Sequence, residues 1–199
     1  MEYTLNTVAP IVLFPFIAFV INAFIGKRLP RQGDWLSTGA IFLSFLWSLR
    51  IFNEVILNNY SDSYLVHKVF NWIDLSYGSQ SFKIDLGILI DNMSTVMLVM
   101  VSGVATLIHL FSTFYMKGDA KYGKFFVFLS LFTSAMLGLV LSDNLLSIFI
   151  FWELMGFCSY SLIGFYHEKE EAGAASIKAF MTTRVGDVCF FLGILALWN

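Results

Sequence analysis

The sequence predicts an all-α integral membrane protein of about six transmembrane helices, with an external β-hairpin between the second and third helices. Hydrophobic residues make up 58% of the 199 residues and charged residues only 13%. Soluble domains carry about 25% charged residues. Apolar stretches recur along the whole length, and no long polar segment is left to form a soluble domain. We therefore expect a single membrane domain over residues 1–199.

Six stretches are long and apolar enough to cross a membrane. About 20 largely apolar residues are needed to cross a hydrocarbon core of roughly 30 Å. The predicted spans lie at about 8–25, 35–57, 91–116, 125–141, 144–166 and 174–198. We expect the first span to stay as a helix, because the start of the chain lacks the basic segment of a cleaved signal peptide. Three glycines are expected to permit close helix packing: Gly138, Gly156 and Gly164.

The segment 61–89, between the second and third spans, has a different pattern. Apolar and polar residues alternate from Tyr64 to Trp72, and a turn at 77–79 leads into a second alternating run from Phe82 to Leu86. This alternation predicts a β-hairpin. Because a strand edge needs water or a neighbouring subunit to satisfy its backbone groups, we expect the hairpin on the outer surface.

Basic residues in the short loops predict the orientation, because they favour the cytoplasmic side. The connection at 142–144 has no lysine or arginine. The loops after the first and third spans have three each: Lys27, Arg28 and Arg31, then Lys117, Lys121 and Lys124. The N-terminus is therefore expected outside. Near the end of the second span, Arg50 and Glu54 have the spacing of a local ion pair.

Several classes of function find no support in the sequence. No phosphate loop, nucleotide fingerprint, catalytic triad or metal-ligand cluster is present. The two cysteines, Cys158 and Cys189, lie in apolar runs without metal-ligand spacing. No basic block of the kind that binds nucleic acid occurs. We therefore expect no catalytic residue, cofactor site, metal site or redox chemistry in this chain, and no nucleic-acid partner.

The informative residues are charges at membrane depth, because each costs several kcal/mol unless it is paired or hydrated. At about 1.5 Å per residue, Glu153 lies roughly 13 Å into the fifth span, and Arg184 lies roughly 15 Å into the sixth from the opposite face. These two charges should share one level. Asp187 follows Arg184 by three residues, so the two can pair within their helix. Lys178 is expected about one turn inside the sixth span, where it could reach the interface.

Two interpretations of this group are open. In the structural one, Arg184 and Asp187 neutralise each other, and Glu153 forms a packing hydrogen bond with a neighbouring helix. In the functional one, Glu153 exchanges protons, because burial raises the pKa of a carboxyl group and a nearby cation lowers it. His109, in the third span, is a candidate proton relay, because imidazole titrates near neutral pH. It could equally be a packing residue.

A resemblance is carried by three runs in the order of the chain. They are LIDNMSTVMLVMVSGVATLIHLFSTFYMKGD, LSDNLLSIFIFWELMGFCSYSLIGFYHE and GAASIKAFMTTRVGDV. Together with the preceding hairpin, they resemble the large antiporter-like subunit of respiratory complex I, which is the L subunit of bacteria and the fifth ND subunit of mitochondria. The resemblance covers more than half of the chain, and it implies that the helices are part of an antiporter-like helix bundle.

The resemblance implies roles for individual residues. The acid of the family's FWE motif corresponds to Glu153, which in that family belongs to a proton path and pairs with a lysine on the seventh helix. The acid of the TRVGD motif corresponds to Asp187, and Lys178 and His109 match polar positions of the family. The family's chain is about three times longer, with further lysines and a long lateral helix. We therefore expect this chain to be an N-terminal piece of such a subunit.

The implied function is proton translocation coupled to quinone reduction in NADH:quinone oxidoreductase. Partners would be other membrane-arm subunits and the lipid bilayer, with flavin, iron-sulfur clusters and quinone held by partner subunits. The expected location is the bacterial inner membrane, which is favoured over the mitochondrial inner membrane. Two alternatives stay open: the large subunit of a multisubunit sodium/proton antiporter, which shares these motifs, and a membrane scaffold or assembly subunit.

Overall fold

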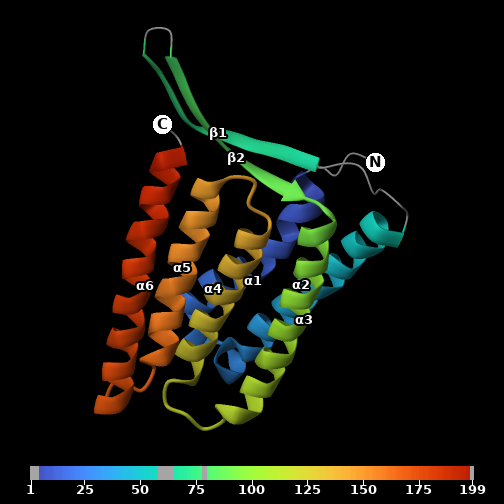
Figure 1. Ribbon diagram of the computed structural model, residues 1–199. Coiled ribbons are helices and arrows are strands. Elements are labelled where there is room, and N and C mark those ends of the chain that lie inside the picture. The colour runs from blue at the N-terminus through green and yellow to red at the C-terminus, as the bar shows by residue number, and fades with distance from the viewer. Residues whose placement is uncertain (1–4, 58–64, 78–79, 198–199) are drawn as a thin grey trace.

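Within its described residues, the protein is a bundle of six long helices with a two-stranded sheet at one end (Figure 1). The computed structural model describes residues 5–57, 65–77 and 80–197. All six helices are long and apolar enough to span a membrane. They are α1 (Leu5–Ile25), α2 (Asp34–Phe52), α3 (Asn92–Tyr115), α4 (Tyr122–Val140), α5 (Leu145–Ile163) and α6 (Glu170–Leu197). The protein is therefore an integral membrane protein, as its composition predicts.

The short elements between the helices refine the predicted bounds. The 3-10 turns η1 (Gly26–Arg28) and η2 (Pro30–Gly33) connect α1 to α2, and a π-helical turn, η3 (Asn53–Leu57), follows α2. The sixth helix begins at Glu170 rather than at about 174, because Glu170 and Glu171 occupy its first turn. Acidic side chains there stabilise the positive end of the helix dipole. This start places Lys178 about two turns inside α6, deeper than expected.

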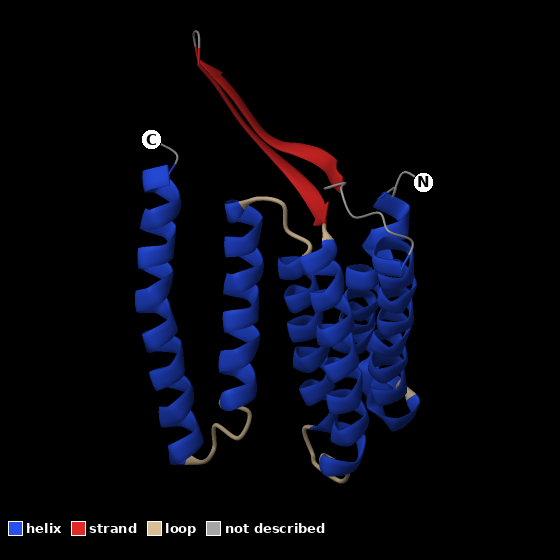
Figure 2. Ribbon diagram, turned by 45° about the vertical axis from the view of Figure 1, so that its right-hand side comes forward, coloured by secondary structure: helices blue, strands red, loops and turns tan. Residues whose placement is uncertain are grey.

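Helices α1 to α4 form the packed part of the bundle, and α5 and α6 stand to one side of it (Figure 2). In α4, 44% of the most apolar window is buried, whereas the fraction is 11% in both α5 and α6. The apolar core is formed mainly by side chains from α1, α2, α3 and α4. It includes Val8, Ile11, Ile51, Leu98 and Leu137. Much of the surface of α5 and α6 is therefore free to contact lipid or protein.

A proline in α1 shows how the bundle satisfies its backbone without water. Pro15 has no N–H, so the carbonyl of Ile11 loses its partner within the helix. The hydroxyl of Ser44 on α2 donates to that carbonyl at 2.9 Å. A backbone group left unpaired in the membrane would cost several kcal/mol, so this bond helps to hold α2 against α1.

The strands β1 (Leu65–Tyr77) and β2 (Gln80–Ile90) pair antiparallel within the segment where the hairpin is predicted. The register runs from Leu65 opposite Ile90 to Tyr77 opposite Gln80. The sheet lies at the end of the bundle where α3 and α5 begin (Figure 1). The side of the membrane on which it lies stays a prediction.

The end of β2 is attached to the connection between α4 and α5. The amide of Leu89 donates to the carbonyl of Leu141 at 2.9 Å, and the amide of Gly87 donates to the carboxylate of Asp143 at 3.1 Å. Immediately after β2, Asp91 caps α3 by accepting from the amide of Ser94 at 2.6 Å. The sheet, the start of α3 and the α4–α5 connection therefore form one hydrogen-bonded unit.

The three glycines predicted to permit close packing differ in their surroundings. A Cβ added to Gly138 would lie 2.5 Å from the Phe151 ring, and one added to Gly164 would lie 2.9 Å from the Ser176 hydroxyl oxygen. Gly138 therefore allows α4 to approach α5. The prediction is wrong for Gly156, because a Cβ there would have no neighbour within 4 Å.

Candidate proton-path site on α5 and α6

The candidate site lies halfway along the two outer helices. Glu153 is next to Leu154, the middle residue of α5, and Arg184 is one of the two middle residues of α6. The predicted common level of these two charges therefore agrees with the helix bounds. At such depth a charged side chain needs a partner or water.

Arg184 is the centre of the cluster. Its guanidinium forms an ion pair with Glu153 across the two helices. The same nitrogen atom, Nη1, lies 3.4 Å from a carboxylate oxygen of Asp187. The guanidinium carbon lies 4.6 Å from the centre of the Phe180 ring, which favours a cation over its face. One arginine is therefore shared between two carboxylates on neighbouring helices.

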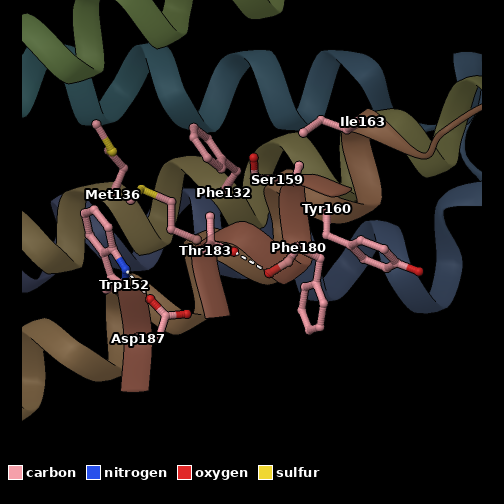
Figure 3. A pocket seen from close by; sticks show the side chains of 12 residues that line it. Phe132, Met136, Trp152, Ser159, Tyr160, Ile163, Phe180, Thr183 and Asp187 are labelled. Atoms are coloured by element: carbon pink, nitrogen blue, oxygen red, sulfur yellow. Dashed lines mark hydrogen bonds between the residues drawn. The ribbon is translucent and has the colours of Figure 1, made fainter. Parts of the chain in front are cut away.

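Trp152 holds the second carboxylate from the opposite helix. Its indole N–H donates to Asp187 Oδ1 at 3.0 Å, and Figure 3 shows the two side chains facing each other. Asp187 is 8% exposed. The role of Trp152 is not predicted by the sequence, because a tryptophan in an apolar span indicates only burial or an interface position. Its place beside Glu153 in the FWE run was the available signal.

The two carboxylates differ in their remaining freedom. Asp187 has 10% of its side chain exposed, accepts a hydrogen bond from Trp152 and forms an ion pair with Arg184. Glu153 has 25% of its side chain exposed and forms an ion pair with Arg184. Glu153 is therefore the member of the cluster whose charge depends most on the position of one guanidinium.

A cavity of about 310 Å³ opens beside the cluster, between α4, α5 and α6. Five residues with polar side-chain atoms line it: Asp187, Trp152, Thr183, Tyr160 and Ser159 (Figure 3). The rest of the wall is apolar and includes Phe132, Met136 and Phe180. The cavity is large enough for several water molecules, each of which occupies about 30 Å³ in the liquid.

His109 lies apart from the cluster. It is fully buried on α3, and its Nδ1 is 2.8 Å from the carbonyl of Ala105. Its Nε2 has no hydrogen-bond partner within the described part of the chain. A second cavity, of about 220 Å³, lies beside His109. Phe132 and Met136 of α4 line both this cavity and the one at the cluster, so these two side chains separate them.

The other predicted site residue, Lys178, is exposed on α6 and belongs to neither cavity. Arg50 and Glu54 form their expected pair, with 3.0 Å between Nε and Oε1, away from the site. Among residues 5–57, 65–77 and 80–197, no cluster of His, Cys, Asp and Glu could hold a metal ion. The two carboxylates and the guanidinium of the site can take part in proton exchange and ion pairing.

Two protein families match separate parts of the chain. Residues 72–126 match the N-terminal region of chain 5 of NADH-ubiquinone oxidoreductase (complex I). Residues 142–199 match the membrane region described as NADH:quinone oxidoreductase/Mrp antiporter. Together the two matches include most of the hairpin, all of α3, α5 and α6, and the cluster on α5 and α6, whereas most of α4 lies between them.

Individual relatives extend the similarity to almost the whole chain. NADH-ubiquinone oxidoreductase chain 5 of Metridium senile is 40% identical over 93% of this chain and 30% of its own length. The F(420)H(2) dehydrogenase subunit L of Methanosarcina mazei is 43% identical over 93% of this chain and 26% of its own length. In fold, the chain is similar to a chain of an archaeal membrane-bound sulfane sulfur reductase, with a TM-score of 0.77 and 17% identity, over 94% of this chain and 36% of that one.

The chain thus spans less than a third of the length of these curated relatives. Within that length, the two families match in the order of the chain, and the identity with the relatives extends towards the N-terminus beyond residue 72. The chain belongs to the family of subunit L and chain 5 of the NADH:quinone oxidoreductases.

Proposed function

We propose that this chain is an antiporter-like, proton-translocating part of a membrane subunit of NADH:quinone oxidoreductase, and that Glu153 is its proton-exchanging group. The observation that carries the proposal is the sharing of Arg184 between Glu153 and Asp187 halfway along two neighbouring helices. A purely structural pair would need one carboxylate, whereas this cluster has two.

The charge of the cluster supports proton exchange. With both carboxylates ionised, Glu153, Asp187 and Arg184 together carry one net negative charge. An uncompensated charge at this depth costs several kcal/mol, and one bound proton would remove it. A cation in contact with a carboxylate favours its charged form. Movement of Arg184 away from Glu153 and towards Asp187 would therefore favour proton uptake by Glu153, and the return would favour release.

The two cavities offer a route for the proton. Water in the cavity beside Asp187 could hydrate the cluster, and His109 could relay protons from the cavity on the other side of Phe132 and Met136. Passage between the cavities would require these two apolar side chains to move. Lys178 would supply positive charge near the start of α6.

The names of the relatives support a role separate from electron entry. One relative is named for oxidation of NADH and another for oxidation of F(420)H(2). Enzymes that use different electron donors share this segment. A role in a step that they have in common, such as proton translocation, explains this better than a role in binding the donor. We therefore infer that flavin, iron-sulfur clusters and quinone belong to partner subunits, and that this chain assembles with other membrane-arm subunits.

We infer a location in the bacterial inner membrane. The basic loops at 26–33 and 116–124 support an orientation with the N-terminus outside. The sheet formed by β1 and β2 would then lie on the outer surface. The mitochondrial inner membrane is the second possibility.

A Glu153→Gln substitution in the assembled complex tests the proposal. The substitution keeps the size of the side chain and removes its exchangeable charge. We expect a lower number of protons translocated per NADH oxidised in inverted membrane vesicles, with assembly retained on native gels. The matched control is Glu54→Gln, which neutralises the carboxylate of the Arg50 pair near the end of α2. Normal pumping by Glu153→Gln would remove Glu153 from the mechanism.

A second candidate function is the large subunit of a multisubunit cation/proton antiporter, because the family matched by residues 142–199 includes Mrp antiporters. Purification of the tagged chain with its partners distinguishes the two. Flavin and iron-sulfur subunits with NADH dehydrogenase activity would support the first function, and small hydrophobic antiporter subunits without that activity would support the second. A scaffold role predicts normal pumping by the Glu153→Gln variant.

A further inference from the structure

A large cavity with three lysines in its wall lies at the opposite end of the bundle from the sheet, where α1 ends and α4 begins. Its volume is about 880 Å³. Its wall combines lysines, a buried amide and apolar side chains. The lining residues include Asn22, Lys27, Lys121, Lys124, Val127 and Phe128. None of these residues belongs to the cluster on α5 and α6.

The wall of this cavity is strongly positive. Three lysines line it, and no aspartate or glutamate is among its lining residues. Lys121 forms an ion pair with Glu168 at 2.7 Å. Lys27 and Lys124 are exposed, and neither forms an ion pair with any residue that the structure describes. The first turn of α4 adds the positive end of a helix dipole. An anion is therefore the ligand that this wall would attract.

A buried acceptor lies in the same cavity. Asn22 is 5% exposed, and its Nδ2 donates to the carbonyl of Gly33 at 3.0 Å and to the hydroxyl of Ser37 at 2.7 Å. Its Oδ1 has no hydrogen-bond partner in the described ranges. A buried acceptor left unsatisfied costs about 1–3 kcal/mol. A ligand that brings a hydroxyl group into the cavity would satisfy it.

We propose that this cavity binds the headgroup of an anionic glycerophospholipid such as phosphatidylglycerol. The lysines bind the phosphate, and a glycerol hydroxyl donates to Asn22 Oδ1. Basic pockets between the ends of transmembrane helices suit such headgroups. Val127 and Phe128 continue along α4 from the lysines, and they offer an apolar surface for the start of an acyl chain. A free phosphate would share the lysines and leave this surface unused.

Binding of single lipids to the purified chain tests the proposal. The chain is delipidated in mild detergent and titrated with phosphatidylglycerol or phosphatidylcholine, and bound lipid is counted by native mass spectrometry. The test variant is Lys27→Gln with Lys124→Gln. The control is Arg28→Gln with Lys117→Gln, which removes the same charge at the same end of the bundle from residues that do not line the cavity.

We expect wild type and control to bind phosphatidylglycerol alike and in preference to phosphatidylcholine. The Lys27/Lys124 variant should bind it about thirtyfold more weakly, since each lysine near an anionic surface contributes about fivefold. Equal loss in the test and control variants would overturn the proposal, because general charge would then explain binding. Displacement of the lipid by equimolar inorganic phosphate would also overturn it, because the site would then be one for soluble phosphate.

Discussion

Replacing Gly138 by alanine tests the closest approach of α4 to α5, on which the position of the candidate site depends. The new Cβ would lie 2.5, 2.7 and 2.8 Å from three carbon atoms of the Phe151 ring. The ring or the helix must move to accept it. Overpacking of this kind costs about 1–3 kcal/mol, whereas glycine-to-alanine in a helix gains about 0.5–1 kcal/mol. We expect the free energy of unfolding to fall by about 1–2 kcal/mol.

The matched control is Gly156→Ala on α5, where the new Cβ meets nothing within 4 Å. This variant should be as stable as wild type or more stable by about 0.5–1 kcal/mol. Unfolding is measured by titration with sodium dodecyl sulfate in mixed micelles. In a Phe151→Ala background, the loss caused by Gly138→Ala should disappear. Equal stability of the two alanine variants in the wild-type background would refute the reasoning.

Three further predictions concern single hydrogen bonds. Asp91→Ala removes the cap of α3, and the same titration should show a loss of about 1 kcal/mol. Trp152→Phe keeps an aromatic ring but removes the donor to Asp187, and the loss should be about 1.5 kcal/mol. The hydroxyl of Tyr166, which donates to Asp119 at 2.7 Å, is the main cause that lowers the pKa of Asp119 below 3.8. Tyr166→Phe should raise that pKa, as measured by carboxyl NMR.

Each of these predictions has its own opposing outcome. Asp91→Asn should retain most of the cap, so equal losses from alanine and asparagine would point to another role. Trp152→Phe should leave the fold intact, so full unfolding would point to a packing role for the indole. The Asp119 contribution is present above pH 3.8 and disappears as the pH falls through the lowered pKa. An unchanged pKa of Asp119 in Tyr166→Phe would contradict the role of the Tyr166 hydrogen bond in lowering it.

Composition and helix periodicity were enough to predict the six spans and the level of the charges. The rise per residue placed Glu153 and Arg184 at one depth, and the i, i+3 spacing placed Asp187 near Arg184. Predicting the ion pair across α5 and α6 requires the rotation of each helix about its own axis. The spacing of residues within one helix does not give that rotation. The start of α6 was set too late because hydropathy gives little weight to acidic first-turn residues.

Long-range polar contacts were beyond the reach of the sequence. Asp34 is fully buried at the start of α2, where the hydroxyl of Tyr122 donates to it at 2.7 Å and Arg31 pairs with it at 2.9 Å. Tyr122 comes from the start of another span, and no local pattern joins the two. Trp152 is a similar case, since its partner lies one helix later. Segments 58–64 and 78–79, at the ends of the predicted hairpin strands, lie outside the described residues.

The bond between Leu89 and Leu141 has a consequence for the biogenesis of the protein. Two membrane crossings, α3 and α4, separate these residues in the chain. The bond forms only when both residues emerge on the same side of the bilayer, which requires α3 and α4 to insert together as a pair. An intermediate with one of them inserted would leave the amide and the carbonyl on opposite sides. The contact is therefore incompatible with a chain in which only one of the two helices has crossed the bilayer.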